Sequence, residues 1–567
     1  MIAIDITVIV LYLIGMIAIA IYTRNKAKTV KDYLLAGSKG LNGWMSAFAY
    51  GTTYFSAVIF IGYAGKFGFG FGLAAVWIGI GNAVVGALLA WKVLARRTKN
   101  MTVRLDAKTM PDFFYKRYGD EKMKLVSAII IFIFLIPYAA SVYNGLGNLF
   151  SIVFDVPGWI VMIVLAAVTA FYLFLGGYIA TSLTDFIQGI IMFVGVIIML
   201  FFFLGSEQVN WGEGLKTLTD REMGLFMGGA SSGNFLYGRE MSLIFLILLT
   251  SFGVWALPQT IHKYYTVRDE KAIKQGTIVS SIFALVIGFG AYFIGGLATL
   301  FYDKAPGGNT DNVVPHMIKD VLPNGLLGLI AVLVLAASMS TLASVSLASS
   351  SVVTIDIYKG SIKKKASDKK VTLMMRVLAL VFVVIATGIA YLNSIYDITA
   401  IAYMMGLSWG TLAGCFIGPY VLGVVWKKTT RAAAWTSIIG SLVLTFVLII
   451  VVGYDKSGWG AATFGQAVKA GVGASPMIGV ICMAFSMIST FVVSLFTKQL
   501  PEDKIKEAFE KPIDIETLPE PISEEEEKEE PEQASYPVYA SVAKTALNKS
   551  ELDAAPDATT AVNKNNE

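Results

Sequence analysis

Long apolar runs, each of about 20 residues, follow one another along most of this chain and are separated by short polar segments. A run of this length crosses the hydrocarbon core of a bilayer as one helix, because a helix rises about 1.5 Å per residue. Apolar residues make up 56% of the chain and charged residues only 15%. The sequence therefore predicts an all-α membrane protein with many spans.

We expect about thirteen spans, or about twelve if the fifth and sixth join across Gly176 and Gly177. The expected segments are roughly 3–23, 41–64, 70–95, 124–153, 157–176, 182–205, 239–262, 273–301, 323–357, 372–392, 397–425, 431–453 and 476–497.

Basic residues gather in every second loop between the expected spans. They are Arg24, Lys26, Lys28 and Lys31; Arg96, Arg97, Lys99 and Arg104; Lys263, Arg268, Lys271 and Lys274; Lys359, Lys363, Lys364 and Lys365; and Lys427, Lys428 and Arg431. Such loops face the cytoplasm. We therefore expect a multi-pass protein of the plasma (inner) membrane, with its N-terminus outside and its C-terminus inside. The net charge of +5 reflects these loops and predicts no nucleic-acid partner.

The residues needed for several enzyme classes are absent. The only cysteines are Cys415 and Cys482, and the only histidines are His262 and His316. No Gly-rich loop ends in the Lys-Ser or Lys-Thr that cradles nucleotide phosphates. We therefore expect neither an enzyme nor an ATP-driven pump, and no cofactor. A transporter of this composition draws its energy from an ion gradient.

The ninth expected span carries neighbouring hydroxyls at Ser340 and Thr341, with the carbonyl of Ala337 one turn earlier. Together these oxygens could bind a dehydrated cation such as Na⁺, which takes neutral oxygen ligands. Alternatively, the hydroxyls only bond to carbonyls of their own helix or to a neighbouring helix. This segment alone leaves both interpretations open.

Two expected spans contain residues that interrupt a helix. The second contains residues 51–57, with Gly51 and several hydroxyl residues, and the seventh contains Pro258, which removes a backbone donor. They lie five spans apart, which indicates an inverted repeat with its binding site between the halves. The ninth span would then bring its oxygens to the exposed carbonyls of Thr52 and Phe55.

Several motifs resemble those of the sodium:solute symporters, a family of proline, pantothenate, monocarboxylate and sugar cotransporters. They are residues 176–180 with 184–188, residues 339–342 with 356–358, and the less specific segment 32–37. The resemblance covers roughly residues 5–450. It implies a five-plus-five inverted repeat of the leucine-transporter type, with one additional helix before it and two after it.

The same resemblance implies a sodium site at the carbonyls of Thr52, Phe55 and Ala337 and the hydroxyls of Ser340 and Thr341. It also gives Asp185 a part in sodium release or coupling. The segment Ser182 to Asp185 reads equally well as a capping box at the start of the sixth span.

The substrate is less well defined by the sequence. We expect no Lys or Arg in the centre of the protein, so backbone amides and hydroxyls would hold a carboxylate. The residues around Pro258 are similar to the pantothenate and monocarboxylate branch, whereas Tyr54 replaces an acid found in proline transporters. Candidate lining residues, for which ordinary packing is the alternative, are Tyr54, Ser56, Tyr138, Tyr143, Phe252, Trp255 and Gln259.

These features predict inward Na⁺ flow coupled to uptake of a small solute, either a monocarboxylate, a pantothenate-like compound or an amino acid. The alternatives are a proton-coupled carrier of the same fold and a transporter-like nutrient sensor. Expected partners are Na⁺, the solute and the lipid bilayer, with no obligate protein partner. The expected parts are residues 1–40 (first helix and loop), 41–205 and 239–425 (the repeats), 426–498 (two further spans) and 499–567 (an acidic, disordered tail).

Overall fold

The computed structural model describes residues 2–24, 29–35, 40–226, 238–323, 325–396, 398–459 and 462–509. Within these ranges the chain is helical and contains no strand, apart from one isolated bridge between Leu41 and Val267. The expected all-α class is thus confirmed. Lys26, Lys28, part of the segment 32–37 and the chain after residue 509 lie outside the described residues.

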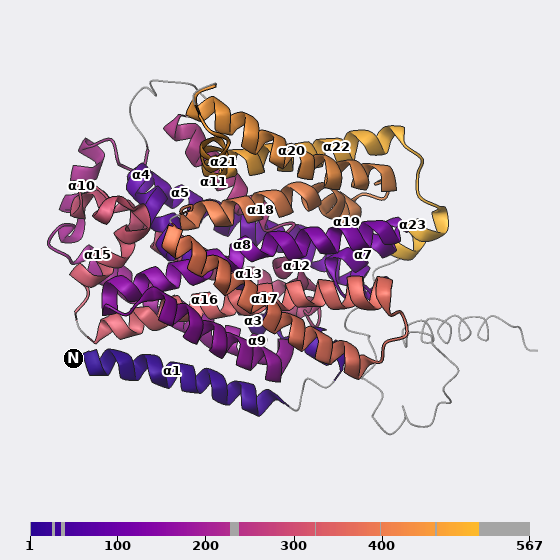
Figure 1. Cartoon of the computed structure of the whole chain (residues 1–567), viewed down its shortest axis with the longest axis horizontal. Helices are drawn as coiled ribbons and strands as arrows, with labels where there is room; N and C mark the ends of the chain where they lie inside the picture. Colours follow the sequence, from indigo (N-terminus) through magenta and orange to yellow (C-terminus); the bar gives the residue numbers. More distant parts are fainter. Residues whose placement is uncertain are drawn as a thin grey trace, which may run out of the picture. The chain divides into compact units, whose positions relative to one another are not determined.

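The helices in the N-terminal half begin at one end of the bundle with α1 and are numbered along the chain in Figure 1. Their bounds are α1 Ile2–Thr23, α2 Val30–Leu35, α3 Gly43–Tyr54, η2 Val58–Gly68, α4 Phe69–Phe71, η3 Gly72–Ala75, α5 Val76–Gly81, η4 Asn82–Leu89, η5 Trp91–Ala95, α6 Arg96–Arg104, α7 Met110–Tyr118, α8 Glu121–Phe154, α9 Gly158–Leu204, η6 Asn210–Gly212 and α10 Glu213–Asp220.

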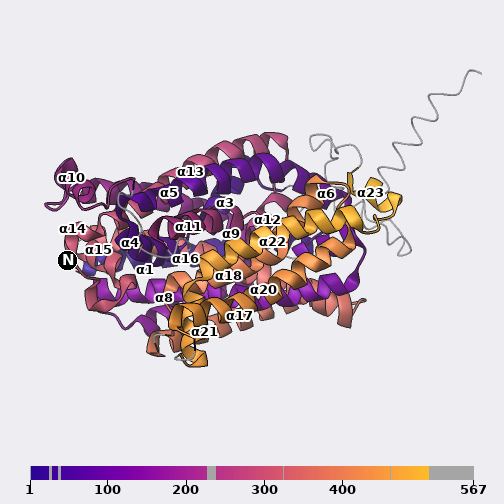
Figure 2. The same cartoon turned by 90° about the horizontal axis from the view of Figure 1, so that it is seen from above.

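The remaining helices complete the bundle (Figure 2). They are α11 Arg239–Gly253, α12 Pro258–Tyr265, α13 Glu270–Gly296, α14 Ala298–Phe301, η8 Pro306–Gly308, η9 Thr310–Asn312, α15 Val313–Val321, α16 Leu326–Ser351, η10 Val352–Ile362, α17 Asp368–Tyr396, α18 Ile401–Ile417, η11 Gly418–Leu422, α19 Gly423–Val425, α20 Arg431–Ser457, α21 Phe464–Gly473, α22 Ser475–Phe496 and α23 Glu502–Phe509.

Among the described residues, 11 helical stretches are long and apolar enough to cross a membrane. Two of them, Val58–Arg104 and Gly158–Leu204, are 47 residues long. Each contains a glycine with a positive φ, Gly72 (+63°) and Gly177 (+53°), a backbone conformation that interrupts a regular helix. The expected number of thirteen spans depends on whether each of these stretches counts once or twice. The number of spans therefore stays a prediction, as do the expected boundaries of the two repeats and of the other parts of the chain.

Both predicted interruptions are confirmed. Helix α3 ends at Tyr54, Phe55 has an extended backbone (φ −105°, ψ 113°), and the chain becomes helical again at Val58. In the same way α11 ends at Gly253, and α12 begins at Pro258, the first residue of the new helix. Each span therefore consists of two shorter helices with a few non-helical residues between them.

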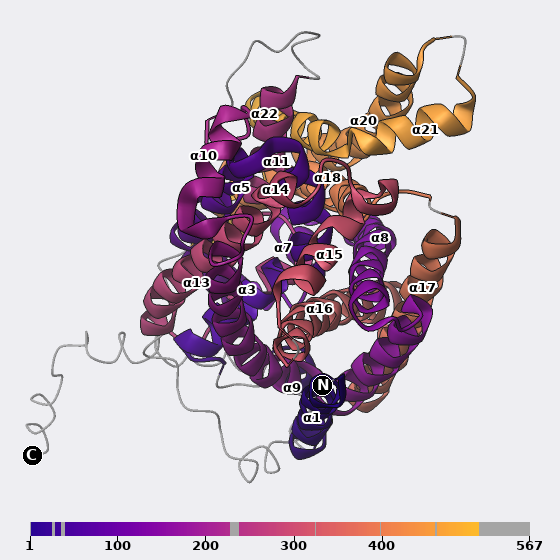
Figure 3. The same ribbon diagram turned by 90° about the vertical axis from the view of Figure 1, so that its left-hand side faces the viewer.

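Helix α16 lies in the interior, between α8 and α9, and α1 packs on the outside of α9 (Figure 3). The start of α16 is fixed by Asp5 of α1. The Asp5 carboxylate accepts hydrogen bonds from the backbone amides of Gly325 (3.1 Å) and Gly328 (2.7 Å). An acid at this position satisfies amides that a helix leaves unpaired at its N-terminus. This contact holds the hydroxyl-bearing helix in its central position.

Close glycine packing joins α18 to α22. A Cβ atom added at Gly410 would lie 2.9 Å from the Cα of Gly479, and one added at Gly414 would lie 2.7 Å from the Cβ of Cys482. Small residues let two membrane helices approach this closely.

The expectation of a disordered tail from residue 499 is wrong for its first residues. These form α23, which packs against α6 and α7. Arg104 donates a hydrogen bond to the carbonyl of Ala508 (3.0 Å), and the guanidinium of Arg117 lies 5.0 Å from the centre of the Phe509 ring. These contacts with α6 and α7 stabilise the helix α23 although its composition is polar.

Candidate functional site

The hydroxyls of α16 meet the broken end of α3. Ser340 Oγ lies 3.1 Å from the carbonyl oxygen of Thr52, and Thr341 Oγ1 lies 3.2 Å from the same oxygen. Ser340 Oγ is also 3.1 Å from the carbonyl oxygen of Ala337. All four residues are fully buried. The sequence-predicted oxygens of two distant segments therefore converge at one point.

Phe55 directly follows this point, and its extended backbone takes its carbonyl out of the helical hydrogen-bond ladder of α3. A carbonyl freed in this way is available to a cation, as are those of other broken membrane helices. Neutral oxygens from two helices form a suitable environment for a monovalent ion that must later be released.

Beside these oxygens lies a group of aromatic side chains. The Tyr138 ring meets Trp409 edge-on at 5.6 Å. The Tyr138 hydroxyl lies close to Ser56, Thr341 and the indole of Trp409, without hydrogen-bond geometry to any of them. Tyr63 lies near Tyr138. Among the described residues, no partner binds the hydroxyls of the two tyrosines or the indole nitrogen of Trp409. Buried polar groups of this kind are normally satisfied, so they are candidates to bind a ligand or water.

Sequence reasoning found Tyr138 and Ser56 here but missed Tyr63 and Trp409. Both missed residues lie in apolar, glycine-containing runs that read as packing segments. Only the fold places them beside the broken helix. The signal that could have identified them is an aromatic residue with a hydrogen-bonding group, Tyr or Trp, inside an expected span.

The other predicted lining residues are more scattered. Tyr54 donates a hydrogen bond to the carbonyl of Thr250 (2.7 Å), which ties α3 to α11. Tyr143 lies close to Thr387 and Tyr172. Phe252 and Trp255 line a separate apolar crevice of about 220 Å³.

Gln259, in the first turn of α12, is buried, and neither its amide nitrogen nor its amide oxygen has a partner among the described residues. A buried amide left without any hydrogen bond is costly. Of the predicted residues outside the aromatic group, Gln259 has the strongest indication of a polar ligand or water.

The structure corrects the expectation that the centre contains no Lys or Arg. Lys263 is not a loop residue: it lies in α12, is 1% exposed and forms an ion pair with Asp185 (Nζ to Oδ2, 3.3 Å). The expected span ends at residue 262, whereas α12 continues to Tyr265, three residues further, so the expectation places Lys263 in a loop. Lys263 lies four residues after Gln259 and therefore on the same face of the helix. Because Gln259 is a predicted lining residue, this spacing could have indicated that Lys263 also faces inward.

The capping-box interpretation of Asp185 is also wrong. Asp185 lies within the helical stretch of α9, and the hydroxyl of Ser182 donates to the carbonyl of Tyr178 (2.8 Å) rather than to a backbone amide of a helix start. The Asp185 carboxylate is therefore available to bind a cation, and in this structure it binds the ammonium of Lys263.

A second ion-pair cluster lies at the end of the bundle opposite to Asp5. Lys124 contacts Asp112 (2.8 Å) and Asp356 (3.3 Å), and Thr109 donates a hydrogen bond to Asp356 (2.9 Å). Burial acts to raise the pKa of Asp112, but the ammonium groups of Lys124 and Lys116 outweigh it and lower that pKa below its ordinary value. The cluster ties α7 and α8 to η10, so Asp356 of the 356–358 motif has a structural partner.

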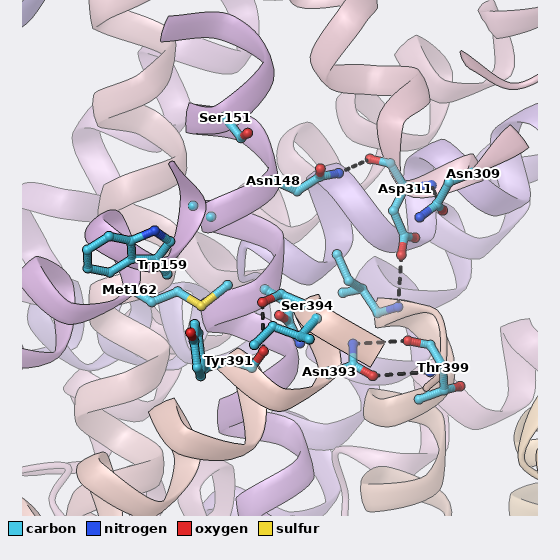
Figure 4. A pocket seen from close by; sticks show the side chains of 15 residues that line it. Asn148, Ser151, Trp159, Met162, Asn309, Asp311, Tyr391, Asn393, Ser394 and Thr399 are labelled. Carbon is cyan, nitrogen blue, oxygen red and sulfur yellow. Dashed lines mark hydrogen bonds between the residues drawn. The ribbon is translucent and has the colours of Figure 1, made fainter. Parts of the chain in front are cut away.

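A polar pocket of about 430 Å³ opens at the end of the bundle where α1 begins (Figure 4). The Asn148 amide donates to the carbonyl of Asp311 (2.8 Å), and the Asn393 amide donates to that of Thr399 (3.1 Å). Figure 4 shows these groups together with Asn309, Tyr391 and Ser394 around the cavity. Uncharged amides and hydroxyls dominate its wall, which suits a vestibule for a small polar solute.

Comparisons with known proteins show the family of this chain. Residues 33–440 match the model of the "Sodium:solute symporter family". The osmoregulated proline transporter OpuE of Bacillus subtilis is 28% identical over 502 residues, covering 86% of this chain and 94% of that protein. A sodium/proline symporter of Staphylococcus aureus is 28% identical over 458 residues, covering 78% and 85%.

The fold is also that of a solved structure, a substrate-bound, outward-open Na⁺-coupled sialic acid symporter. The TM-score is 0.69 at 18% identity, over 88% of this chain and 98% of that one. Because the family match spans most of the chain and includes both interrupted helices and the hydroxyl pair of α16, this chain belongs to the sodium:solute symporter family.

Proposed function

We propose that this protein is a secondary active transporter of the plasma membrane that couples inward Na⁺ flow to the uptake of L-proline. The observation that carries the sodium part is the convergence of the Ser340 and Thr341 hydroxyls on the Thr52 carbonyl at the break in α3. In this proposal Na⁺ binds these oxygens together with the carbonyls of Phe55 and Ala337. The end of the bundle at which α1 begins faces outward.

Support for proline comes from the relatives, which are named as proline transporters. This choice replaces the preference for pantothenate or a monocarboxylate, which rested on the few residues around Pro258. Proline is small, and its carboxylate and secondary amine need only a few hydrogen-bond partners. The unpartnered polar atoms of Tyr63, Tyr138 and Trp409 supply such partners beside the proposed Na⁺ position.

We assign Asp185 to coupling, because it is a buried acid with one carboxylate oxygen that has no hydrogen-bond partner among the described residues. Tyr138 and Ser56 are the lining residues nearest to the proposed ion, and Gln259 contributes from α12. The polar pocket around Asn148 and Asn393 is the outer entrance for the solute.

Uptake into proteoliposomes tests this proposal. Purified protein is reconstituted, and radiolabelled L-proline is added outside with either a NaCl or a choline chloride gradient at constant pH. We expect accumulation only with the Na⁺ gradient. Equal accumulation with choline would contradict sodium coupling, and accumulation driven by a pH gradient in choline would favour the proton-coupled alternative.

The substrate is tested separately from the ion. Unlabelled L-proline, pantothenate, short monocarboxylates and other amino acids compete with the label in the presence of Na⁺. We expect proline to compete most strongly. If proline is not taken up but pantothenate or a monocarboxylate is, sodium coupling stands and the substrate assignment is wrong.

A further inference from the structure

Lys263 is a charged residue in the interior of this protein. It is 1% exposed, in a helix that also carries the buried Gln259. Its ammonium contacts Asp185 Oδ2 at 3.3 Å and Ser344 Oγ at 3.0 Å. The Tyr178 ring lies 5.1 Å away and faces the same ammonium. Three different helical stretches, α12, α9 and α16, thus meet at one positive charge.

The hydrogen bonds around Lys263 have a consistent direction. Thr53 Oγ1 lies 2.7 Å from the carbonyl oxygen of Ala49, to which it donates its proton. The Ser344 hydroxyl, 2.9 Å from Thr53 Oγ1, is then the donor between the two hydroxyls. The lone pairs of Ser344 Oγ are left for the ammonium of Lys263. The geometry is therefore built around a cation at this position.

This cation lies next to the proposed Na⁺ site. Ser344 follows Thr341 by three residues on α16, a rise of about 4.5 Å along the helix axis. Thr53, which bonds to Ser344, follows Thr52, whose carbonyl belongs to the sodium cage. The same two segments, α16 and the end of α3, thus contribute oxygens to both places.

The ligands of Lys263 are those that a hard monovalent cation would take. A carboxylate and a hydroxyl oxygen face the charge, and one carboxylate oxygen of Asp185 has no hydrogen-bond partner among the described residues. A buried carboxylate needs such a compensating charge. Unlike a free ion, the lysine is covalently attached and cannot leave with the solute.

Resting on the proposed sodium coupling, we infer that the Lys263 ammonium is a tethered cation that fills a second cation site, formed by Asp185 and Ser344. The protein therefore binds and moves one Na⁺ per cycle. When the ammonium is removed, the Asp185 carboxylate draws a second Na⁺ into the space beside Ser344. Lys263 thereby sets the ion stoichiometry of this carrier.

The test is equilibrium binding of ²²Na⁺ to the purified full-length protein without solute. We expect one saturable Na⁺ per chain for the unchanged protein and two for Lys263→Ala. The double variant Lys263→Ala/Asp185→Asn should return to one, because it has neither the ammonium nor the carboxylate. Lys364→Ala, which changes an exposed lysine paired with Glu121, should keep one and controls for loss of a positive charge.

The outcomes separate this inference from the proposed function. No saturable Na⁺ binding to the unchanged protein would refute sodium coupling itself. Two Na⁺ bound to the unchanged protein, or one bound to folded Lys263→Ala, would overturn the tethered cation while sodium coupling stands. If Lys263→Ala does not fold, Lys263→Gln, which removes the charge and keeps most of the side-chain volume, takes its place. Two Na⁺ bound to Lys263→Gln are expected, and one bound to the folded variant would overturn the tethered cation.

Discussion

Replacing Thr341 by Val tests the cation site most directly, because valine keeps the shape of threonine and removes only its hydroxyl. Thr341 Oγ1 lies 3.2 Å from the Thr52 carbonyl oxygen and is fully buried. A hydrogen-bond-strength contact to a charged group contributes about 1.5 to 3 kcal/mol. Losing one such oxygen should raise the Na⁺ concentration for half-maximal binding by about ten- to a hundredfold.

The assay is ²²Na⁺ binding to purified protein, with L-proline uptake as a function of Na⁺ concentration as the second readout. Ser338→Ala is the matched control, because Ser338 is equally buried on α16 but donates only to the carbonyl of Val334 in its own helix (2.6 Å). We expect Ser338→Ala to leave Na⁺ affinity unchanged. Unaltered Na⁺ affinity in Thr341→Val would refute a direct role of this hydroxyl and show that the ion binds elsewhere.

Three further outcomes follow from the described contacts. Na⁺ and L-proline should tighten each other's binding by the same factor, because Na⁺ orders the broken α3 beside the solute. Calorimetric titration should give a factor of about five to 150. Equal proline affinity in Na⁺ and in choline would contradict this prediction. Lys124→Ala should lower the free energy of unfolding by about 3 to 5 kcal/mol in chemical denaturation, because it removes the ammonium that faces buried Asp356 and leaves Asp112 with Lys116 alone. Exposed Lys364→Ala should change it by less than about 1 kcal/mol. Since the pKa of Asp112 is lowered, its contribution is present near neutral pH and is lost as the pH falls through that pKa; a pH-independent loss in Lys124→Ala would argue against the ion pairs. Gly414→Val should reduce thermal stability and expression, as its side chain meets Cys482, and a neutral result would show that α18 and α22 can separate.

Composition and local chemistry are enough to predict several features of this protein. Apolar runs of membrane length predict the all-helical class, because a bilayer leaves backbone groups no partner outside a helix or closed barrel. Gly51 and Pro258 predict two broken helices, since both act on their own backbone. The adjacent hydroxyls of Ser340 and Thr341 can likewise be recognised from a short stretch of sequence.

Which side chains face one another depends instead on how the helices pack. Lys263 reads as a loop residue because a helix end cannot be located to within one turn from hydropathy, and one turn separates a cytoplasmic lysine from a buried one. Its partners, Asp185 and Ser344, lie 78 and 81 residues away along the chain. Tyr63 and Trp409 likewise read as packing residues until the fold places their unpartnered polar atoms next to Tyr138. Contacts between distant segments depend on how the helices pack, and no local pattern in the sequence records that packing.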